Sequence, residues 1–351
     1  MAYQALASSS HFAYSAAHQK RFFGTPINIR FLITPDYVSM NKFLREVLAD
    51  LRCEPKKLSS KYFYDARGDQ LFRQIMACPE YYPARSEMEI FSEQSGELAE
   101  VLINGFKSFA LVELGAGDAS KTTHLLKRLT DRKAEFTYVP IDISETTMNY
   151  LKDHLPGFIP GIKVKGFNGE YFDMLSQVNE QIAGNKSVLM LGGNLGNETP
   201  ENVLLFCRRL RKCLKKGDRV LIGFDLKKNP AQIRAAYDDS GGLTREFNLN
   251  LLTRINRELE GDFEISRFTH YASYDPSTGA CKSFLVSLAE QTVTIAGVKF
   301  QFEKDECVFT EISQKYTAGE IGALANSASF KTVKNFHDRQ GWFVDTVWEC
   351  I

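Results

Sequence analysis

The chain has 351 residues, a length that predicts about two domains, each able to bury its own core. Lys and Arg together number 43, as do Asp and Glu, and this balance argues against nucleic acid or an anionic membrane as the main partner. The composition, 44% hydrophobic and 25% charged, is that of a globular protein, and no apolar run approaches the ~20 residues of a membrane span.

The seven cysteines are scattered, form no C-x-x-C motif and share no ligand spacing with the six histidines. We therefore expect free thiols in a reducing compartment, the cytoplasm, and no metal site. Nothing in the sequence requires an oligomer, so we expect a monomer.

Residues 1–39 differ from the rest of the chain, because no Asp or Glu occurs between Met1 and Pro35. This composition is compatible with an organellar transit peptide, but we interpret the segment as a disordered leader or a non-native extension. An amphipathic helix is predicted to begin at Met40.

The stretch from about 40 to 105 has a helical pattern, interrupted by the sequence CPEYYPARSE at residues 78–87. Two prolines frame Tyr81 and Tyr82 and stiffen the backbone around them. Packing explains one tyrosine, whereas two in a rigid bend suggest that a phenol group points at a ligand.

Four short apolar runs follow between residues 109 and 226, with helical patterns between them: FALVEL, FTYVPIDI, SVLMLGG and RVLIGFDL. Such runs are typical of parallel strands buried on both faces, so the region predicts a doubly wound, mostly parallel α/β sheet. After Asp225 the alternation stops. Residues 228–315 indicate an α+β domain inserted into the first, and the tail is expected to supply the last strands of the sheet.

The loop VELGAGDASK, residues 112–121, follows the first of these strands and opens a helix. Gly115 and Gly117 permit a tight turn and a close approach to a ligand. Asp142 ends the next strand, where a carboxylate can accept both hydroxyl groups of a ribose. The dinucleotide motif has a third glycine where this chain has Ser120, so the pattern favours S-adenosylmethionine. A loop that binds NAD(P), or no ligand at all, is the alternative.

Two further polar motifs lie beyond this loop. Asn197, in GGNLGNETP, either holds a carboxylate or an amine, or caps the helix that starts near Pro200. Glu311 and Ser313, in the strand-like TEISQKY, point to the same face and match the one N–H and the one bare nitrogen of a neutral imidazole. The alternative for this pair is a solvated edge strand, and Tyr237 by itself is typical of a core or a turn.

These segments, in order from about residue 57 to 316, resemble the histidine Nα-methyltransferases of ergothioneine biosynthesis. The resemblance rests on KYFYDARGDQLFRQI, PEYYPARSE, VELGAGDASKT, the Asp of VPIDIS, GNLGN, GDRVLIGFDLKK, AYDDSGG-LTREFN-N, INREL, F-H-A and TEIS-KY. It implies an enzyme that uses S-adenosylmethionine to methylate the α-amino group of L-histidine, to the trimethylated betaine hercynine.

The resemblance also implies a domain organisation. A Rossmann-type methyltransferase domain takes residues 86–227 and 316–351. A discontinuous α+β substrate-binding domain takes residues 40–85 and 228–315.

The family's site residues transfer to this chain position by position. The cofactor positions fall on Gly115, Lys121, Asp142, Glu170 and Tyr171, and the substrate positions on Tyr81, Asn197, Tyr237, Glu311 and Ser313. Tyr82 is then expected to pack, and no dedicated catalytic base is apparent.

Three positions depart from the family pattern. Glu170 and Tyr171 replace Asp and Phe, which are conservative changes, and Ser283 replaces a methionine that shapes the side-chain end of the pocket. A tryptophan-derived substrate is therefore an alternative, as are an NAD(P)-dependent oxidoreductase and a non-catalytic S-adenosylmethionine-binding module. The Glu311 and Ser313 pair favours imidazole over indole, because an indole has only a donor.

Overall fold

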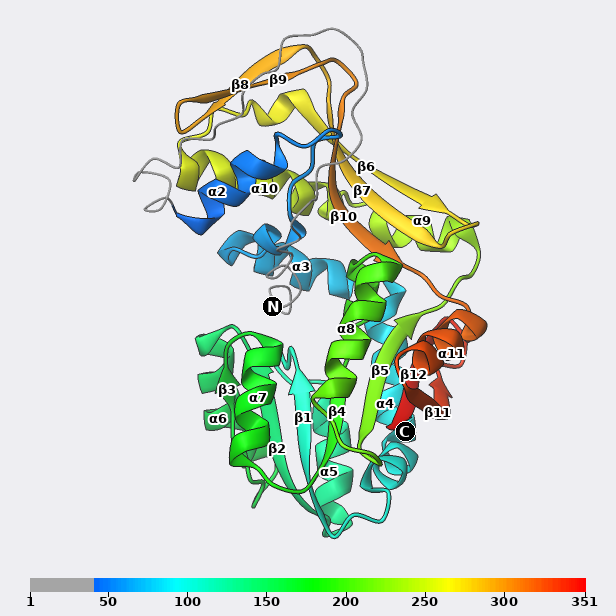
Figure 1. Ribbon diagram of the computed structural model, residues 1–351. Coiled ribbons are helices and arrows are strands. Elements are labelled where there is room, and N and C mark those ends of the chain that lie inside the picture. Colours follow the sequence, from blue (N-terminus) through cyan, green and yellow to red (C-terminus); the bar gives the residue numbers. More distant parts are fainter. Residues whose placement is uncertain (1–40) are drawn as a thin grey trace, which may run out of the picture.

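The computed structural model describes residues 41–351 and shows two parts, one stacked on the other (Figure 1). The leader expected at residues 1–39 lies outside the described residues. The lower part is built on a seven-stranded sheet, and the upper part combines helices with two small sheets.

The large sheet has the strand order β11-β12-β5-β4-β1-β2-β3. Its strands are β1 (Ser108–Leu114), β2 (Glu135–Asp142), β3 (Phe167–Asn168), β4 (Asn185–Met190), β5 (Arg219–Asp225), β11 (Phe330–His337) and β12 (Phe343–Cys350). The strands from β3 to β5 pair in parallel, and β12 is antiparallel to both of its neighbours. The predicted doubly wound, mostly parallel sheet is confirmed, and the tail supplies its last two strands. Among the strands of this sheet in the described residues, the two-residue β3 was not predicted from the sequence.

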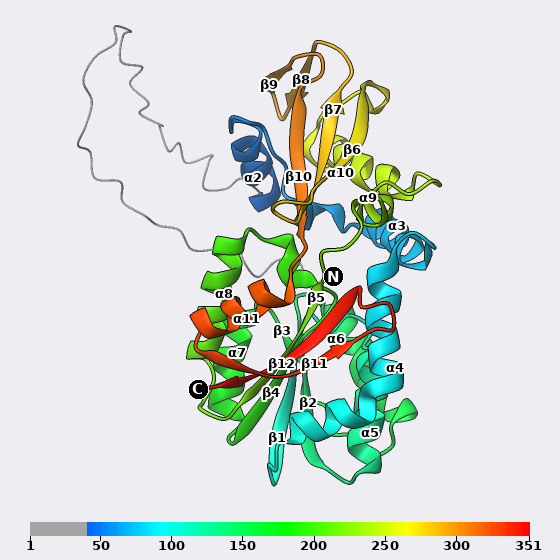
Figure 2. The same cartoon turned by 90° about the vertical axis from the view of Figure 1, so that its right-hand side faces the viewer.

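Helices cover both faces of this sheet (Figure 2). One face carries α4 (Tyr82–Ile103), α5 (Thr122–Asp131) and α6 (Glu145–Phe158), and the other α7 (Tyr171–Gln181), α8 (Pro200–Lys212) and α11 (Ala318–Ser327). Because side chains alternate along a strand, Leu111 packs into the core between the sheet and α4, α5 and α6. Val112 packs into the core on the opposite face. Both are fully buried, which explains the continuous apolar runs in the sequence.

The upper part has a separate hydrophobic core. Its helices are α2 (Lys42–Asp50), η1 (Ser60–Phe63), α3 (Ala66–Ala77), α9 (Pro230–Tyr237), α10 (Leu243–Leu259) and η3 (Ile265–Arg267). Its strands are β6 (Phe268–Asp275), β7 (Ala280–Ser287), β8 (Gln291–Ile295), β9 (Val298–Phe302) and β10 (Cys307–Gln314). The boundary placed between residues 85 and 86 falls inside the first turn of α4, which packs on the large sheet.

The chain returns from the upper part to the lower part beside the place where it left. The N–H of Tyr316 donates to the carbonyl of Asp225 at 3.0 Å, and the N–H of Lys227 donates to the carbonyl of Tyr316 at 2.8 Å. These bonds hold the ends of β5 and β10 together. Side chains from both parts therefore meet at this junction.

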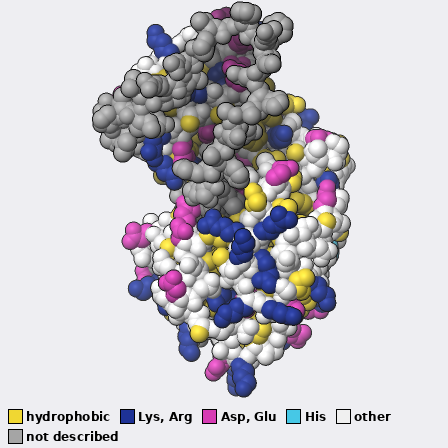
Figure 3. Space-filling model, in the orientation of Figure 1, with side chains coloured by type: hydrophobic (Ala, Val, Ile, Leu, Met, Phe, Trp, Pro, Cys, Tyr) yellow, Lys and Arg dark blue, Asp and Glu magenta, His cyan; other side chains and the backbone are white. Residues whose placement is uncertain are grey.

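The surface carries charges of both signs, as the balanced composition requires (Figure 3). Within residues 41–351 no helix combines the length and the hydropathy needed to cross a membrane. The same residues contain no group of three or more His, Cys, Asp or Glu side chains placed to hold a metal ion.

Candidate active site

A cavity of about 610 Å³ lies between the two parts, at the carboxyl ends of β1, β4 and β5. Ligands bind at this edge in open α/β sheets. Seven of the ten residues predicted for the site line it: Tyr81, Gly115, Lys121, Asn197, Tyr237, Glu311 and Ser313. The structure thus brings the glycine loop and the polar residues of β10 to one cavity.

The glycine loop opens onto this cavity between β1 and α5. Gly115 and Gly117 have φ values of 76° and 54°, a region in which L side chains are strained. A Cβ atom added at Gly117 meets nothing within 4 Å, although the residue lines the cavity. The loop backbone therefore borders open space, and the cradle fits a ligand that approaches the main chain closely.

The carboxylate of Asp142 holds this loop from below. It accepts hydrogen bonds from the N–H groups of Gly117, at 3.3 Å, and Ser144, at 2.9 Å. Burial raises the pKa of Asp142, although these hydrogen bonds act in the opposite direction. Asp142 is fully buried and does not line the cavity as the structure describes it.

Glu170 and Tyr171 lie next to Asp142 but also stand outside the cavity lining. The N–H of Gly169 donates to the carbonyl of Asp142 at 3.0 Å, and Glu170 is the N-cap of α7. Tyr171 is buried in the core between the sheet and α7. Asp142, Glu170 and Tyr171 therefore lie together, close to the glycine loop but outside the lining of the cavity.

Lys121 is paired with Glu87, which the sequence reasoning did not select. Glu87 lies on α4, is fully buried, and forms an ion pair with the ammonium group of Lys121. The two carboxylate oxygens of Glu87 also accept the N–H of Gly192, at 2.7 and 2.9 Å. Glu87 therefore links the loop after β1 to the loop after β4. Its place in the motif PEYYPARSE was the available signal.

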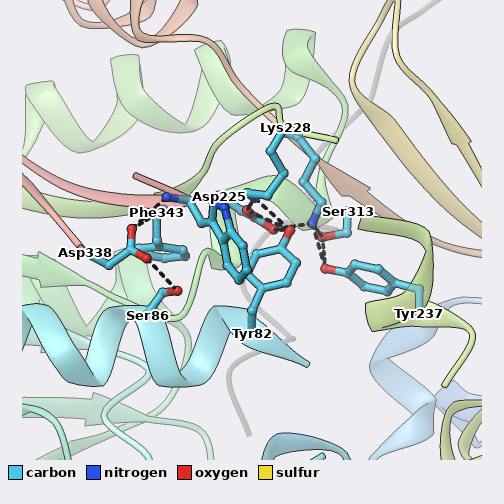
Figure 4. Close-up of polar contacts among 10 residues, drawn as sticks. Tyr82, Ser86, Asp225, Lys228, Tyr237, Ser313, Asp338 and Phe343 are labelled. Atoms are coloured by element: carbon cyan, nitrogen blue, oxygen red, sulfur yellow. Dashed lines mark hydrogen bonds and ion pairs between the residues drawn. The ribbon is translucent and has the colours of Figure 1, made fainter. Parts of the chain in front are cut away.

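Tyr82 is buried as expected, but its hydroxyl group does more than pack. It lies 2.8 and 3.0 Å from the two carboxylate oxygens of Asp225, and Lys228 donates to it at 2.8 Å (Figure 4). Lys228 is also ion-paired with Asp225. Burial lowers the pKa of Lys228 to about 8, although the Asp225 carboxylate opposes this shift.

The other side of Asp225 contacts Lys315, a second residue that the sequence reasoning missed. The ammonium nitrogen of Lys315 lies 2.8 Å from Asp225, 2.7 Å from the hydroxyl of Tyr237 and 2.8 Å from that of Ser313. Tyr237 and Ser313 were both predicted as substrate residues, and Figure 4 shows them on the side of Asp225 opposite to Asp338 and Phe343. The motif TEISQKY contains Lys315, but its sequence gives no sign that the lysine is buried.

Aromatic side chains form the wall of the cavity in the upper part. Tyr64, Phe72 and Phe247 pack with ring centroids 5.6–5.8 Å apart, and Tyr81 lies against Phe72 at 6.3 Å and Tyr237 at 6.1 Å. All five line the cavity. The rigid bend therefore places Tyr81 in this wall, in contact with the predicted substrate residue Tyr237.

Asn197 ends the short helix η2 (Asn194–Asn197) and lines the cavity. The suggestion that it caps the next helix is wrong, because Thr199 is the N-cap of α8 and its side chain accepts the N–H of Asn202. A solvated edge strand does not describe Ser313 either, which is 9% exposed and borders the cavity. Ser283 pairs with Glu311 in the sheet register, but it is buried and is not among the described lining residues.

Comparison with known proteins identifies the family. A family model described as a histidine-specific, S-adenosylmethionine-dependent methyltransferase matches residues 43–350. The chain belongs to this family. As a member of it, this methyltransferase uses S-adenosylmethionine as its cofactor, and the open cradle at Gly117 fits such a ligand.

Individual relatives differ in the amino acid they are named for. A histidine N-alpha-methyltransferase from Mycobacterium tuberculosis is 33% identical over 301 residues, which cover 85% of this chain and 92% of that protein. One from Mycolicibacterium smegmatis has the same identity and coverage. An L-tryptophan methyltransferase from Psilocybe serbica is 29% identical over 304 residues, covering 80% of this chain and 84% of that protein. Membership of the family therefore leaves the amino acid to be argued from the site.

Proposed function

We propose that this methyltransferase methylates the α-amino group of L-histidine, in successive steps, to the trimethylated betaine. The observation that carries the proposal is that Glu311 and Ser313 line the same cavity as the glycine loop. A carboxylate that accepts the ring N–H and a hydroxyl that serves the bare ring nitrogen complement a neutral imidazole.

The cofactor end of the cavity is assigned to the residues around the glycine loop: Gly115, Lys121, Asp142, Glu170 and Tyr171. Bound S-adenosylmethionine supplies a methyl group on a positively charged sulfur. The protein's task is to hold an unprotonated amine behind that methyl group, at roughly 3 to 3.5 Å.

The substrate end is assigned to Tyr81, Asn197, Tyr237, Glu311 and Ser313. Asn197 and Tyr237 hold the carboxylate and amine of the amino acid, while Glu311 and Ser313 hold its ring. Because Glu311 and Ser313 fix the position of the ring, the length of the substrate determines where its α-amino nitrogen lies relative to the methyl group. A buried polar site of this kind rejects ligands that leave its groups unpaired.

A tryptophan-derived substrate is the second candidate, because two relatives are named for tryptophan or a tryptophan derivative. An indole donates its N–H but has no bare nitrogen for Ser313. Ser283, the departure from the family methionine, is buried outside the described cavity lining, so it does not itself enlarge that surface. The polar pair therefore favours histidine.

A labelled-methyl assay tests this assignment. Purified protein is incubated with methyl-labelled S-adenosylmethionine and a panel of single amino acids that includes histidine and tryptophan. We expect label in mono-, di- and trimethylated histidine. Label in tryptophan alone, or in no amino acid, contradicts the proposal.

We further propose that the protein works as a monomer in the cytoplasm. Its seven cysteines are all free thiols in the structure, which supports a reducing compartment. Light scattering on the purified protein measures the mass, and a dimer mass contradicts the first half of this proposal.

A further inference from the structure

Lys315 is the most deeply buried cation at the substrate end of the cavity. It follows β10 directly, is 0% exposed, and forms a 2.8 Å ion pair with Asp225. Burial alone lowers the pKa of a lysine, but here the Asp225 carboxylate outweighs burial and the pKa of Lys315 is raised. The ion pair with Asp225 therefore favours the charged ammonium form of this side chain.

An ammonium group has three hydrogens to donate and no lone pair to accept with. In Lys315 they go to Asp225, to the oxygen of Tyr237 at 2.7 Å and to the oxygen of Ser313 at 2.8 Å. The two hydroxyl oxygens are themselves 2.8 Å apart, so one of them donates to the other. Together they then keep one hydrogen and one lone pair for a ligand.

We propose that Lys315 is a positioning residue that turns Ser313 into an obligatory hydrogen-bond donor toward the substrate ring. This inference rests on the proposed histidine substrate. Either hydroxyl can donate in the bond that joins Tyr237 and Ser313, and we assign Tyr237 as the donor because a phenol is the stronger acid. Lys315 and Tyr237 then fill both lone pairs of the Ser313 oxygen, and its own hydrogen is left to meet the bare nitrogen of the imidazole. Without Lys315 one lone pair of the Ser313 oxygen is open, and the hydroxyl can also accept a hydrogen bond from the ligand.

The physical consequence is a preference for one protonation state of the ligand. A neutral imidazole gives its N–H to Glu311 and receives the hydrogen of Ser313. An imidazolium presents a second N–H to an oxygen that has no lone pair left, beside a buried ammonium charge. Binding is therefore lost as the ring is protonated, near pH 6.5.

The titratable groups around Lys315 bear on whether the pH dependence of binding reports the protonation of the ligand ring. They come from the segments on all sides of Lys315, and are Tyr64, Tyr81, Tyr82, Asp225, Lys228, Tyr237, Tyr274, Cys281, Glu311 and Tyr316. Burial raises the pKa of each of these tyrosines and brings that of Cys281 to about 12, whereas Lys315 and Lys228 hold the pKa of Asp225 low against the effect of burial. Burial lowers the pKa of Lys228 to about 8, so this group begins to titrate at the upper end of the pH range, and the Lys228→Met variant removes its contribution. A Glu311→Gln variant separates the titration of Glu311 from that of the ring.

The test is a binding measurement with a ligand whose amine cannot titrate. The dissociation constant of the trimethylated betaine of histidine is measured by calorimetry between pH 5.5 and 7.5, with S-adenosylhomocysteine bound. For the wild type we expect it to rise up to tenfold per pH unit below about 6.5. The same rise is expected in Glu311→Gln, on a weaker baseline.

Lys315→Met is expected to weaken binding at pH 7.5 about tenfold and to reduce the acid-side rise to less than threefold per pH unit, which corresponds to the loss of about one charge-assisted hydrogen bond. Lys228→Met is the matched control. Lys228 also pairs with Asp225 and has a 7% exposed side chain, but it does not line the described cavity. It should keep the pH dependence of the wild type.

Tyr237→Phe provides a second variant if Lys315→Met does not fold, because it frees the other lone pair on Ser313 and leaves the ion pair between Lys315 and Asp225 intact. It should flatten the acid-side rise as well. A wild-type dissociation constant independent of pH, or the same pH dependence in every variant, overturns the role of Lys315. If the wild type neither methylates histidine nor binds the betaine, it is the proposed function that fails instead.

Discussion

Tyr81 and Tyr82 are neighbours in the chain, yet they serve different cores. Tyr81 lies in the aromatic wall of the cavity, against Phe72 and Tyr237. Tyr82 is 1% exposed, packs edge-to-face against Trp342 with ring centroids 5.3 Å apart, and contacts the Asp225 carboxylate. The bend before α4 therefore fixes both parts of the molecule at one point, which is a physical reason for two adjacent tyrosines.

Replacement of Glu311 by alanine tests the imidazole assignment. We expect kcat/KM for histidine to fall about 100-fold, because a charge-assisted hydrogen bond to the ring is lost and its N–H stays unpaired. Steady-state kinetics measures the effect. Glu303→Ala, at an exposed position after β9, is the control. Unchanged kcat/KM in Glu311→Ala means that the carboxylate does not hold the ring.

Replacement of Asp142 by alanine tests the cofactor end. The change removes the acceptor for the Gly117 and Ser144 N–H groups and the proposed ribose contact, so S-adenosylmethionine should bind about 10- to 100-fold more weakly. Calorimetry gives the affinity. Asp173→Ala, an exposed carboxylate on α7, should bind as the wild type does. Equal affinities for both variants contradict the assignment.

At the scale of residues, the sequence predicts a site residue only where that residue belongs to a distinctive motif. Seven predicted residues line the cavity because they belong to segments whose pattern is distinctive. Lys315, Asp225 and Glu87 escaped prediction because charged residues are expected at the surface. Their burial depends on partners far away in the chain: Lys315 and Asp225, for instance, meet only where β10 and β5 end side by side.

At the scale of elements, the site depends on how closely η2 packs against β10. A Cβ atom added at Gly196 would lie 2.8 Å from the carbonyl oxygen of Gln314, which is closer than real side chains come. Gly196 precedes Asn197, and Gln314 follows Ser313. The missing side chain therefore sets the distance between two predicted substrate residues.

Gly196→Ala should push η2 away from β10 and raise KM for histidine about tenfold, with a smaller effect on binding of S-adenosylmethionine. It should also lower the free energy of unfolding by about 1–3 kcal/mol, as overpacking does. Gly322→Ala is the matched control, since it lies in α11 with no atom within 4 Å of the added Cβ. There alanine should be neutral or stabilising by about 0.4–1 kcal/mol. Equal KM values in both variants rule out the spacing role.

The elements themselves were predictable where the physics is local. Apolar runs predicted β1, β2, β4 and β5, because both faces of these strands are buried. The two-residue β3 was not predictable, since it is a strand only through its pairing with β2. Asn197 illustrates the same limit, because its neighbour Thr199 was equally able to cap α8 and does so.

At the scale of the whole molecule, each part contains a titratable group whose effect on stability changes with pH in the opposite direction to the other. Glu113 is buried, and His270 is partly exposed but its two ring nitrogens are buried. His270 lies on β6 in the upper part, and burial lowers its pKa to about 4. Glu113 lies on β1 in the lower part, and burial raises its pKa to about 7, although hydrogen bonds from Tyr138 and Thr122 oppose the shift. The two groups change the free energy of unfolding in opposite directions as the pH changes, so their effects partly cancel in the wild type. Variants at each position are needed to separate the two effects.

The folded protein binds fewer protons at His270 than the unfolded chain does between about pH 4 and 6.5, so this residue costs stability as the pH falls. It binds more protons at Glu113 between about pH 4.5 and 7, so that residue costs stability as the pH rises. Relative to the wild type, His270→Gln should therefore gain up to about 1.4 kcal/mol per pH unit on acidification, and Glu113→Gln should gain as much on raising the pH. Urea unfolding at several pH values measures both, with the exposed His154→Gln as control. If the two parts unfold together, each variant shifts the single transition. If they unfold separately, each variant shifts only the transition of its own part. If the free energy of unfolding changes with pH in both variants as it does in the wild type, the burial of these titratable groups is contradicted.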